Sequence, residues 1–129
     1  MSAGTILLIE DNPIQRQQLV TILHQQGFRV LIATDGNEAL NQLSSRPLPD
    51  LILLDMLVPN GYFDGWWFFE QRQRFPALAS VPVIITTALT IASREWATAM
   101  GAAGLLRKPI DAEALLLEIR RSLSMAERS

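Results

Sequence analysis

Acidic, hydroxyl and basic side chains stand at the ends of four apolar segments of this chain. In chain order they are the pair Glu10-Asp11, Asp55, the pair Thr86-Thr87, and Lys108. If they meet, like-charged carboxylates repel by up to about 4 kcal/mol per pair at about 4 Å and an effective dielectric constant near 20. A hard divalent cation removes this repulsion because it binds oxygen ligands. Mg²⁺ suits a site with few protein ligands better than Ca²⁺ does, since phosphate oxygens and water complete its octahedron.

This set of side chains favours phosphoryl transfer onto a carboxylate. A metal ion and the ammonium group of Lys108 would neutralise the charge that develops, and Thr87 could donate to a phosphoryl oxygen. Asp55 is the best candidate for the nucleophile because it ends the central apolar segment, between the acid pair and the Thr and Lys segments. A covalent aspartyl phosphate is an established use of this side chain.

The elements that must position these residues alternate between short apolar runs and longer amphipathic ones. Continuous apolarity is typical of strands that are covered on both faces of a parallel sheet. The predicted strands are Thr5–Ile9, Phe28–Ala33, Leu51–Leu54, Val81–Thr86 and Gly104–Leu106. Five strands that alternate with five helices predict an α/β fold with helices on both faces. Ligands of such sheets bind beyond the carboxyl ends of the strands, where the polar residues stand.

Capping residues delimit the five predicted helices. Asn12-Pro13 favours a helix start, Gly27 a helix end, and Asp35 with Glu38 has the spacing of a capping box. The remaining signals are a start at Phe63 or Asp64, an end before Pro76, a cap at Thr90 or Ser93, an end at Gly101, and a cap at Asp111.

Composition limits the remaining possibilities. The chain has 129 residues, 49% hydrophobic and 19% charged, which predicts a single domain over residues 1–129. A net charge of −2 without a basic cluster argues against direct binding of nucleic acid. There is no cysteine and one histidine, His24, which excludes a thiolate or histidine-rich metal site. No apolar run is long enough for a signal peptide or a membrane span, so we expect a cytoplasmic protein.

Over essentially its whole length the chain resembles the receiver domains of two-component response regulators. The matching pieces are Ile9-Glu10-Asp11-Asn12, the run from Asp50 to Asp55, Val58-Pro59, Asp64-Gly65, the run from Pro82 to Ala88, Gly101-Ala102 and Lys108-Pro109. The resemblance implies a flavodoxin-like, doubly wound five-stranded parallel sheet with strand order 2-1-3-4-5.

The resemblance also implies a role for each polar residue at the strand ends. Mg²⁺ would be bound by Asp11, by Asp55 and by the backbone carbonyl of Leu57, with Glu10 helping through water. Asp55 would be the phosphoacceptor and Lys108 the partner of the phosphate. Thr87 would be the switch hydroxyl, rather than Thr86, because the residue of the family at this position directly precedes an alanine, here Ala88.

The implied partners are those of a signalling protein and not of an enzyme with a separate substrate. The phosphodonor would be a sensor histidine kinase or a phosphotransfer protein. The output would be a downstream protein target or a second copy, bound through the surface of the fourth helix, fifth strand and fifth helix. The end of the chain at Ser129, soon after the last predicted helix, fits a stand-alone receiver and equally a piece of a longer regulator or hybrid kinase.

The chain departs from the family pattern in several places. The loop after Asp55 is longer than the common form, with an insert at residues 60–63. Leu105 replaces a frequent aromatic residue, which excludes an aromatic rotamer switch there. Trp67 stands where a polar residue is common; if exposed it would indicate a partner surface, and if buried, the core. In the family, the residues two positions after the acceptor and after the switch hydroxyl lie at the entrance of the pocket. Here they are Leu57 and Leu89, which are apolar and cannot orient water. This predicts slow self-dephosphorylation; the alternative is that Tyr62 or Asn60 of the longer loop supplies a polar group.

Each of these site residues could instead have a purely structural role, without any part in the chemistry. Glu10 and Asp11 could favour the start of the first helix by their charge, and Lys108 could be a solvated lysine, as we expect of His24 and Arg107. The alternative function is a non-phosphorylated, receiver-like interaction module, which the loss of a site residue would favour; none is lost. A hydrolase on the same fold is disfavoured because there is no glycine-rich phosphate loop and no second Asp two residues after Asp55.

Overall fold

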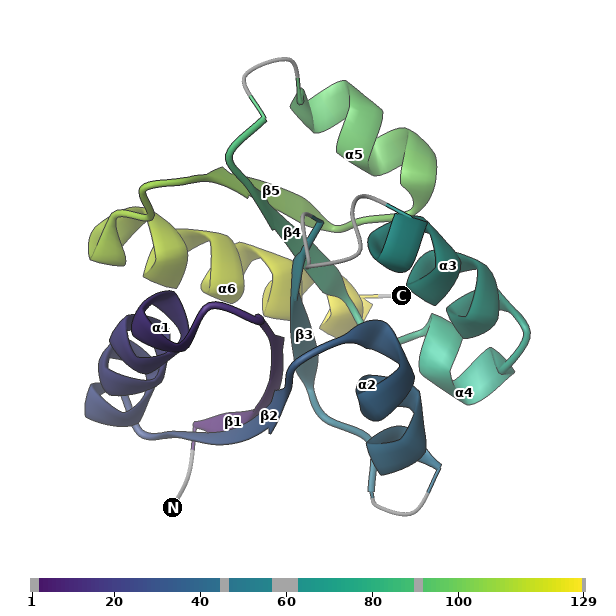
Figure 1. The fold of residues 1–129 in the computed structure, drawn as a ribbon, viewed down its shortest axis with the longest axis horizontal. Coiled ribbons are helices and arrows are strands. Elements are labelled where there is room, and N and C mark those ends of the chain that lie inside the picture. Colours follow the sequence, from purple (N-terminus) through teal and green to yellow (C-terminus); the bar gives the residue numbers. More distant parts are fainter. Residues whose placement is uncertain (1–2, 45–46, 57–62, 90–91, 129) are drawn as a thin grey trace.

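Five parallel strands form one sheet in the order β2-β1-β3-β4-β5 (Figure 1). The structure is a computed structural model that describes residues 3–44, 47–56, 63–89 and 92–128. The strands are β1 (Gly4–Ile9), β2 (Phe28–Ala33), β3 (Leu51–Asp55), β4 (Val83–Thr87) and β5 (Gly104–Arg107). The predicted fold class and strand order are confirmed, although β4 begins two residues later than predicted.

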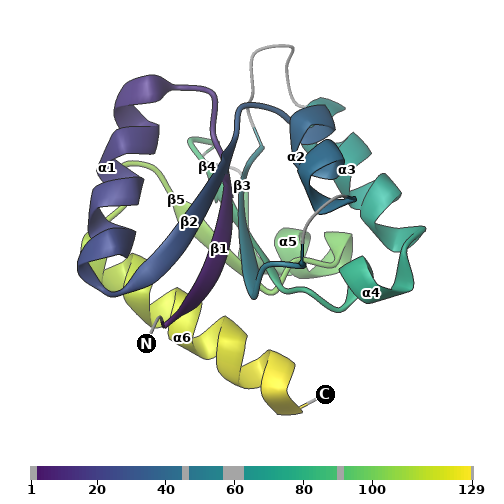
Figure 2. The same ribbon diagram turned by 90° about the horizontal axis from the view of Figure 1, so that it is seen from below.

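Helices cover both faces of the sheet (Figure 2). They are α1 (Pro13–Gln25), α2 (Gly36–Leu43), α3 (Phe63–Gln73), α4 (Pro76–Ala79), α5 (Arg94–Met100) and α6 (Ala112–Arg128). Helices α1 and α6 pack on one face, and α2, α3, α4 and α5 on the other. The sequence predicted five helices. The additional one, α4, is a single turn that begins at Pro76, a residue suited to the first helical position because it lacks an N–H to satisfy.

Alternate residues of the central strands enter two separate apolar cores. On β1, Ile6 and Leu8 face α1 and α6, whereas Leu7 and Ile9 face the other helices, and all four are fully or almost fully buried. Burying each side chain of this size contributes about 1.5–3 kcal/mol. Because a shift by one residue would exchange the two faces, the cores fix the register of the strands and the relative positions of their carboxyl ends.

The predicted starts of α1, α5 and α6 are confirmed by side-chain caps. Asn12 Oδ1 accepts hydrogen bonds from the N–H groups of Ile14 and Gln15, both at 3.0 Å. Of the two alternatives for the fourth predicted helix, Ser93 is the cap, since its Oγ accepts from the Trp96 N–H at 3.1 Å. Asp111 Oδ2 caps α6 through the Ala114 N–H at 2.9 Å, and Gly101 ends α5 with a φ of 102°.

Only half of the predicted capping box is found among the hydrogen bonds of α2. Asp35 Oδ1 accepts from the Glu38 N–H at 2.8 Å, as the spacing predicts. The Glu38 carboxylate instead accepts from the Thr34 hydroxyl at 2.7 Å. His24 is exposed as expected, whereas Trp67 is half-buried and fits neither of its two interpretations fully.

A buried arginine joins α3 to the segment that enters β4. Arg72 is 7% exposed, and its Nη2 donates to the backbone oxygens of Ala79 at 2.8 Å and Val81 at 2.6 Å. Its guanidinium carbon also lies 5.9 Å from the centre of the Phe69 ring. Burial lowers the pKa of Arg72, yet an arginine remains protonated in a protein. One side chain therefore satisfies the carbonyl group of the last residue of α4 and that of a residue just after it.

We expect Arg72→Lys to lower the free energy of unfolding by about 1–3 kcal/mol, because one ammonium group cannot replace the fixed geometry of the guanidinium and leaves a buried carbonyl group unsatisfied. Urea unfolding would measure the change. The matched control is Arg74→Lys, an exposed arginine two residues later, for which a change within about 0.5 kcal/mol is expected. Equal losses in both variants would contradict a specific role for Arg72.

Candidate functional site

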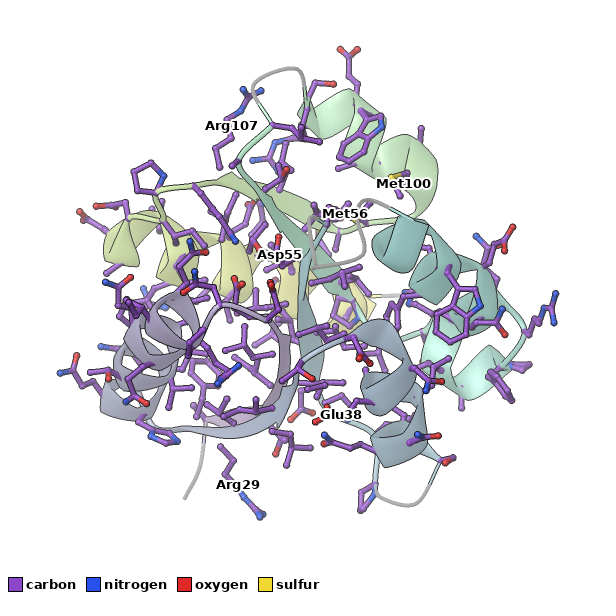
Figure 3. The ribbon with its side chains drawn as sticks, in the orientation of Figure 1. Arg29, Glu38, Asp55, Met56, Met100 and Arg107 are labelled. Carbon is purple, nitrogen blue, oxygen red and sulfur yellow. The ribbon has the colours of Figure 1, made fainter. Side chains whose placement is uncertain are left out.

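The carboxyl ends of the parallel strands bring the predicted polar residues to one edge of the sheet, where Figure 3 labels Asp55. Glu10 and Asp11 follow β1, Asp55 is the last residue of β3, and Thr87 is the last residue of β4. Lys108 follows β5 directly. In the register of the sheet, Asp55 pairs with Thr86, and Thr87 with Arg107. Residues that lie up to 98 positions apart in sequence thus line the same edge.

Three carboxylates form the centre of this edge. Glu10, Asp11 and Asp55 each offer an oxygen atom, and these atoms lie within 4.8 Å of one another. Glu10 is 1% exposed and Asp55 2% exposed, while Asp11 is half-buried. Because burial removes the water that would screen these charges, the cluster needs cations as partners.

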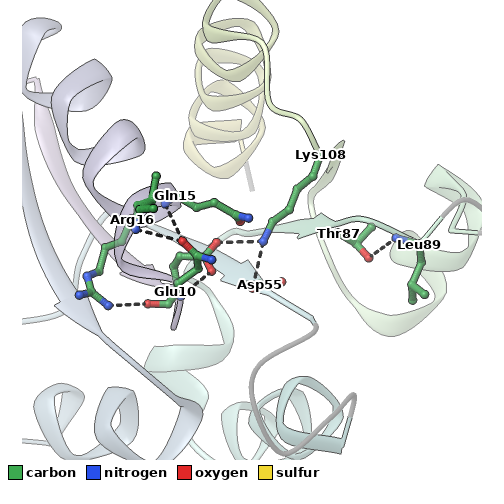
Figure 4. A network of polar contacts seen from close by, with 9 residues as sticks. Glu10, Gln15, Arg16, Asp55, Thr87, Leu89 and Lys108 are labelled. Carbon is green, nitrogen blue, oxygen red and sulfur yellow. Dashed lines mark hydrogen bonds and ion pairs between the residues drawn. The ribbon is translucent and has the colours of Figure 1, made fainter.

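Lys108 is one of those partners (Figure 4). Its Nζ lies 3.0 Å from Glu10 Oε1 and 3.1 Å from Asp55 Oδ2. The interpretation of Lys108 as a solvated lysine is therefore wrong. Burial acts to lower the pKa of Lys108, but the charges of Asp55 and Glu10 outweigh it, so that its pKa is raised and the ammonium form is favoured.

Glu10 takes up protons more readily than an ordinary glutamate. Burial raises its pKa, and a hydrogen bond and the charge of Asp55 raise it further, whereas Lys108 acts in the opposite direction without cancelling the shift. The Asn12 N–H donates to Glu10 Oε2 at 3.2 Å, and Arg16 Nη1 donates to the Glu10 backbone oxygen at 3.2 Å. Sequence reasoning missed Arg16, because a contact with a backbone oxygen requires no particular residue type at position 10.

The Thr87 hydroxyl is engaged within its own segment. Thr87 is fully buried, and its Oγ1 accepts from the Leu89 N–H at 3.0 Å (Figure 4). Leu89 is half-buried. Leu57, whose carbonyl group is a predicted metal ligand, lies outside the described residues, as do residues 60–62 of the predicted insert. Arg107 is exposed as expected, but its guanidinium also donates to the backbone oxygen of Ala92.

The carboxylate cluster fits a small divalent cation. Mg²⁺ binds oxygen atoms at about 2.0–2.1 Å, so two opposite ligands are about 4.2 Å apart. The oxygens of Glu10, Asp11 and Asp55, within 4.8 Å of one another, need to approach only slightly. The ligands offered are carboxylates, which this hard ion prefers. Asp11 is half-buried, so solvent can reach the cluster on its side. Asp11 and Asp55 would hold the ion, and Glu10 could act through water.

Known proteins resemble this chain in sequence and in fold. A family model described as the response regulator receiver domain matches residues 6–120. The protein PilH of Pseudomonas aeruginosa is 31% identical over 120 residues, which cover 92% of this chain and 97% of PilH. PhoB of Escherichia coli, a transcriptional regulator of the phosphate regulon, is 38% identical over 86 residues, 67% of this chain but only 36% of PhoB.

A solved structure with the same fold is the receiver domain of a sensor histidine kinase from Pseudomonas aeruginosa. It has a TM-score of 0.82 and 28% sequence identity, over 95% of this chain and 99% of that domain. In that protein a magnesium ion is coordinated in the active-site cleft. No helix in the described part of the present chain is both long and apolar enough to pass through a membrane.

We expect Mg²⁺ to stabilise the protein against unfolding, by about 1.4 kcal/mol at a concentration ten times its dissociation constant. Asp11→Asn should remove this response, because it deletes a ligand charge at a half-buried position. Glu113→Gln, which likewise replaces a carboxylate by an amide but at an exposed site on α6, is the matched control. Thermal unfolding with and without Mg²⁺ would measure the effect, and an unchanged response in Asp11→Asn would exclude this residue from the site.

The stabilisation by Mg²⁺ should also grow with pH. Because the pKa of Glu10 is raised, the metal-free site holds a proton on Glu10 at low pH, and this proton relieves the repulsion that the metal ion would otherwise relieve. As the pH rises through that pKa the proton is lost and metal binding becomes more favourable. The same unfolding measurements at about pH 5 and about pH 8 should show the larger gain at the higher pH.

Proposed function

The chain belongs to the response regulator receiver domains, and from this we propose that Asp55 accepts a phosphoryl group from a histidine kinase or a phosphotransfer protein, with Mg²⁺ as cofactor. The observation that carries the proposal is the setting of the Asp55 carboxylate. It is 2% exposed, lies 3.1 Å from the Lys108 ammonium and belongs to the three-carboxylate cluster. Lys108, and Mg²⁺ when bound, would neutralise the charge of a phosphoryl group on Asp55.

The reaction is a transfer between two nucleophiles. A carboxylate oxygen of Asp55 forms a new bond to phosphorus while the bond from phosphorus to the donor nitrogen breaks, and the electron pair of that bond stays on the donor. Lys108 can donate to a phosphoryl oxygen and stabilise its charge. Mg²⁺, when bound, supplies further positive charge beside the transferred group.

Asp55 is a better acceptor than its two acidic neighbours. Both carboxylate oxygens of Glu10 accept hydrogen bonds, Oε1 from Lys108 Nζ and Oε2 from the Asn12 N–H, which hold this side chain toward the start of α1. Asp11 is half-buried and better placed toward solvent as a metal ligand. Asp55 ends the central strand, between the carboxylates that follow β1 and the threonines of β4.

The output would be a conformational change in the surface formed by α5, β5 and α6, which correspond to the fourth helix, fifth strand and fifth helix of the sequence prediction. A phosphoryl group adds about −1.5 to −2 charge and strong acceptor oxygens. Thr87 and Lys108, at the ends of β4 and β5, are the residues through which this charge would reach the surface. A downstream protein or a second copy of the chain would then bind there.

The organisation of the chain enters the same proposal. The family model spans residues 6–120, which supports one receiver domain over residues 1–129, working in the cytoplasm as a phosphoacceptor. PilH is similar over almost its whole length, whereas this chain matches about a third of PhoB. The proposal therefore concerns only the activity of a receiver domain and not the activities of the other parts of such longer regulators.

Incubation with acetyl phosphate and Mg²⁺ should add one phosphoryl group to the wild-type protein, because a small donor needs no kinase surface. Asp55→Asn should abolish this product, while Glu113→Gln, an exposed acidic residue on α6, should leave it unchanged. Intact-protein mass spectrometry would measure the product. Equal labelling of Asp55→Asn would refute the assignment of the acceptor, and no labelling of the wild type would favour a receiver-like interaction module.

We further expect the phosphorylated protein to lose its phosphoryl group slowly. Hydrolysis needs a water molecule aligned with phosphorus, and neither Leu57 nor the half-buried Leu89 can orient one. Leu57→Asn or Leu89→Glu should shorten the lifetime about 10-fold, part of the roughly 10²–10⁴-fold that such assistance supplies. Leu117→Glu, on the exposed side of α6, is the control. Rapid decay of the wild type that neither substitution alters would show that another group supplies the water.

A further inference from the structure

A chain of hydrogen bonds leads from Thr87 to the edge strand β5. The Leu89 N–H donates to Thr87 Oγ1 at 3.0 Å. The Ala92 N–H donates in turn to the Leu89 backbone oxygen at 3.3 Å. The Ala92 backbone oxygen accepts from the guanidinium of Arg107, the last residue of β5. The two described residues that flank positions 90–91 are thus linked to each other, to Thr87 and to β5.

A second contact holds the next residues of the same segment. Arg94, at the start of α5, lies 3.0 Å from Glu118 Oε2 on α6. Glu118 is 7% exposed and also accepts from the Leu105 N–H at 3.1 Å and from Arg121 Nε at 2.8 Å. A Cβ at Gly104 would lie 2.9 Å from Glu118 Oε2, so this glycine admits the carboxylate to the edge of β5.

The charge of Glu118 is well supported. Burial acts to raise its pKa, but the hydrogen bonds from Arg121, the Leu105 N–H and Arg94 outweigh burial and lower it. Glu118 is therefore a fixed anion on α6 that attracts the N-terminal end of α5. The Arg94–Glu118 pair and the Arg107–Ala92 contact together are called the β5 clasp below, because they hold Arg94 to α6 and Ala92 to β5.

We propose that Arg107 is a positioning residue for Thr87, and that the β5 clasp keeps the Thr87 hydroxyl turned toward the Leu89 N–H in the unphosphorylated protein. The inference rests on the proposed function, in which Thr87 donates to a phosphoryl oxygen on Asp55. To do so the hydroxyl has to turn toward Asp55, and the Leu89 N–H has to lose its acceptor or move with it. Leu89 is bonded to Ala92, which Arg107 holds, and Glu118 holds Arg94 nearby; these contacts resist the movement, so the clasp opposes activation.

The strength of the clasp is suited to a reversible switch. The Arg94 side chain is 58% exposed, and an exposed ion pair of this kind changes an equilibrium constant by about 1.4- to 5-fold. A single hydrogen bond, such as that from Arg107, changes it by about 2- to 10-fold. The charge of a phosphoryl group can break contacts of this size. Without it, the molecules in which the β5 clasp is formed remain in excess.

The central experiment measures the affinity of the protein for beryllofluoride in the presence of Mg²⁺, by isothermal titration calorimetry. Arg107→Ala should raise this affinity about 2- to 10-fold, while the affinity for Mg²⁺ alone stays unchanged. Arg29→Ala is the matched control, since Arg29 lies on β2 at the opposite edge of the sheet (Figure 3). An affinity that Arg107→Ala leaves unchanged or lowers would overturn the proposal.

A double-mutant cycle tests whether Arg107 acts through Thr87. In a Thr87→Val background, Arg107→Ala should no longer raise the affinity for beryllofluoride, because the hydroxyl that the clasp restrains is absent. A purely structural role of Arg107 would give the same change in both backgrounds. Such a persistent gain would overturn the proposal, even if the single variant behaves as expected.

A measurement on the ligand-free protein separates this proposal from the proposed function. Amide hydrogen exchange of Leu89 should become about 2- to 10-fold faster in Arg107→Ala, and should not change in Arg29→Ala. If wild-type protein binds no beryllofluoride, the proposed function fails, and exchange at Leu89 alone decides whether the clasp exists. Unchanged exchange would overturn it, and faster exchange would support it.

Discussion

Two buried carboxylates share one ammonium group at the centre of the site. Glu10 and Asp55 are almost completely buried at the end of an apolar sheet, where two unpaired anions would be strongly unfavourable. Lys108 Nζ, within 3.1 Å of both, compensates part of that charge. Asp11 adds a third carboxylate. The site thus retains an excess of negative charge, which makes it receptive to a divalent cation.

The apolar sheet holds this unfavourable arrangement in place. Residues of β1, β3 and β4 are buried on both faces, and their register brings Asp55 beside Thr86. Around this rigid centre, two arginines bind backbone oxygens of neighbouring segments. Arg72 of α3 donates to oxygens at and after the end of α4, and Arg107 of β5 donates to the oxygen of Ala92, before α5. These polar contacts are weaker than the apolar core. Movement that follows a change of charge at Asp55 is therefore expected in the outer segments rather than in the sheet.

The sequence was sufficient to predict the fold and most of the residues that meet at the site. Continuous apolar runs and capping residues located every strand and the longer helices, and polar residues at strand ends located Glu10, Asp11, Asp55, Thr87 and Lys108. The single turn α4 was missed because four residues give no periodic pattern. The contacts of Arg72 and Arg107, and that of Glu118 with the Leu105 N–H, were missed because they involve distant backbone groups, which any residue type supplies. The role of the Leu57 carbonyl group remains a prediction.

In the proposed phosphorylated state, Asp55, Lys108 and Thr87 surround one phosphoryl group beside a metal ion held by Asp11 and Asp55. A crystal structure with Mg²⁺ and beryllofluoride would show whether they do. We expect beryllium bonded to a carboxylate oxygen of Asp55, fluorine atoms in contact with Lys108 Nζ and the Thr87 hydroxyl, and Mg²⁺ bound to Asp11 and Asp55. Beryllofluoride bound elsewhere, or bound to Asp55 without contact to Lys108 Nζ and the Thr87 hydroxyl, would contradict this arrangement.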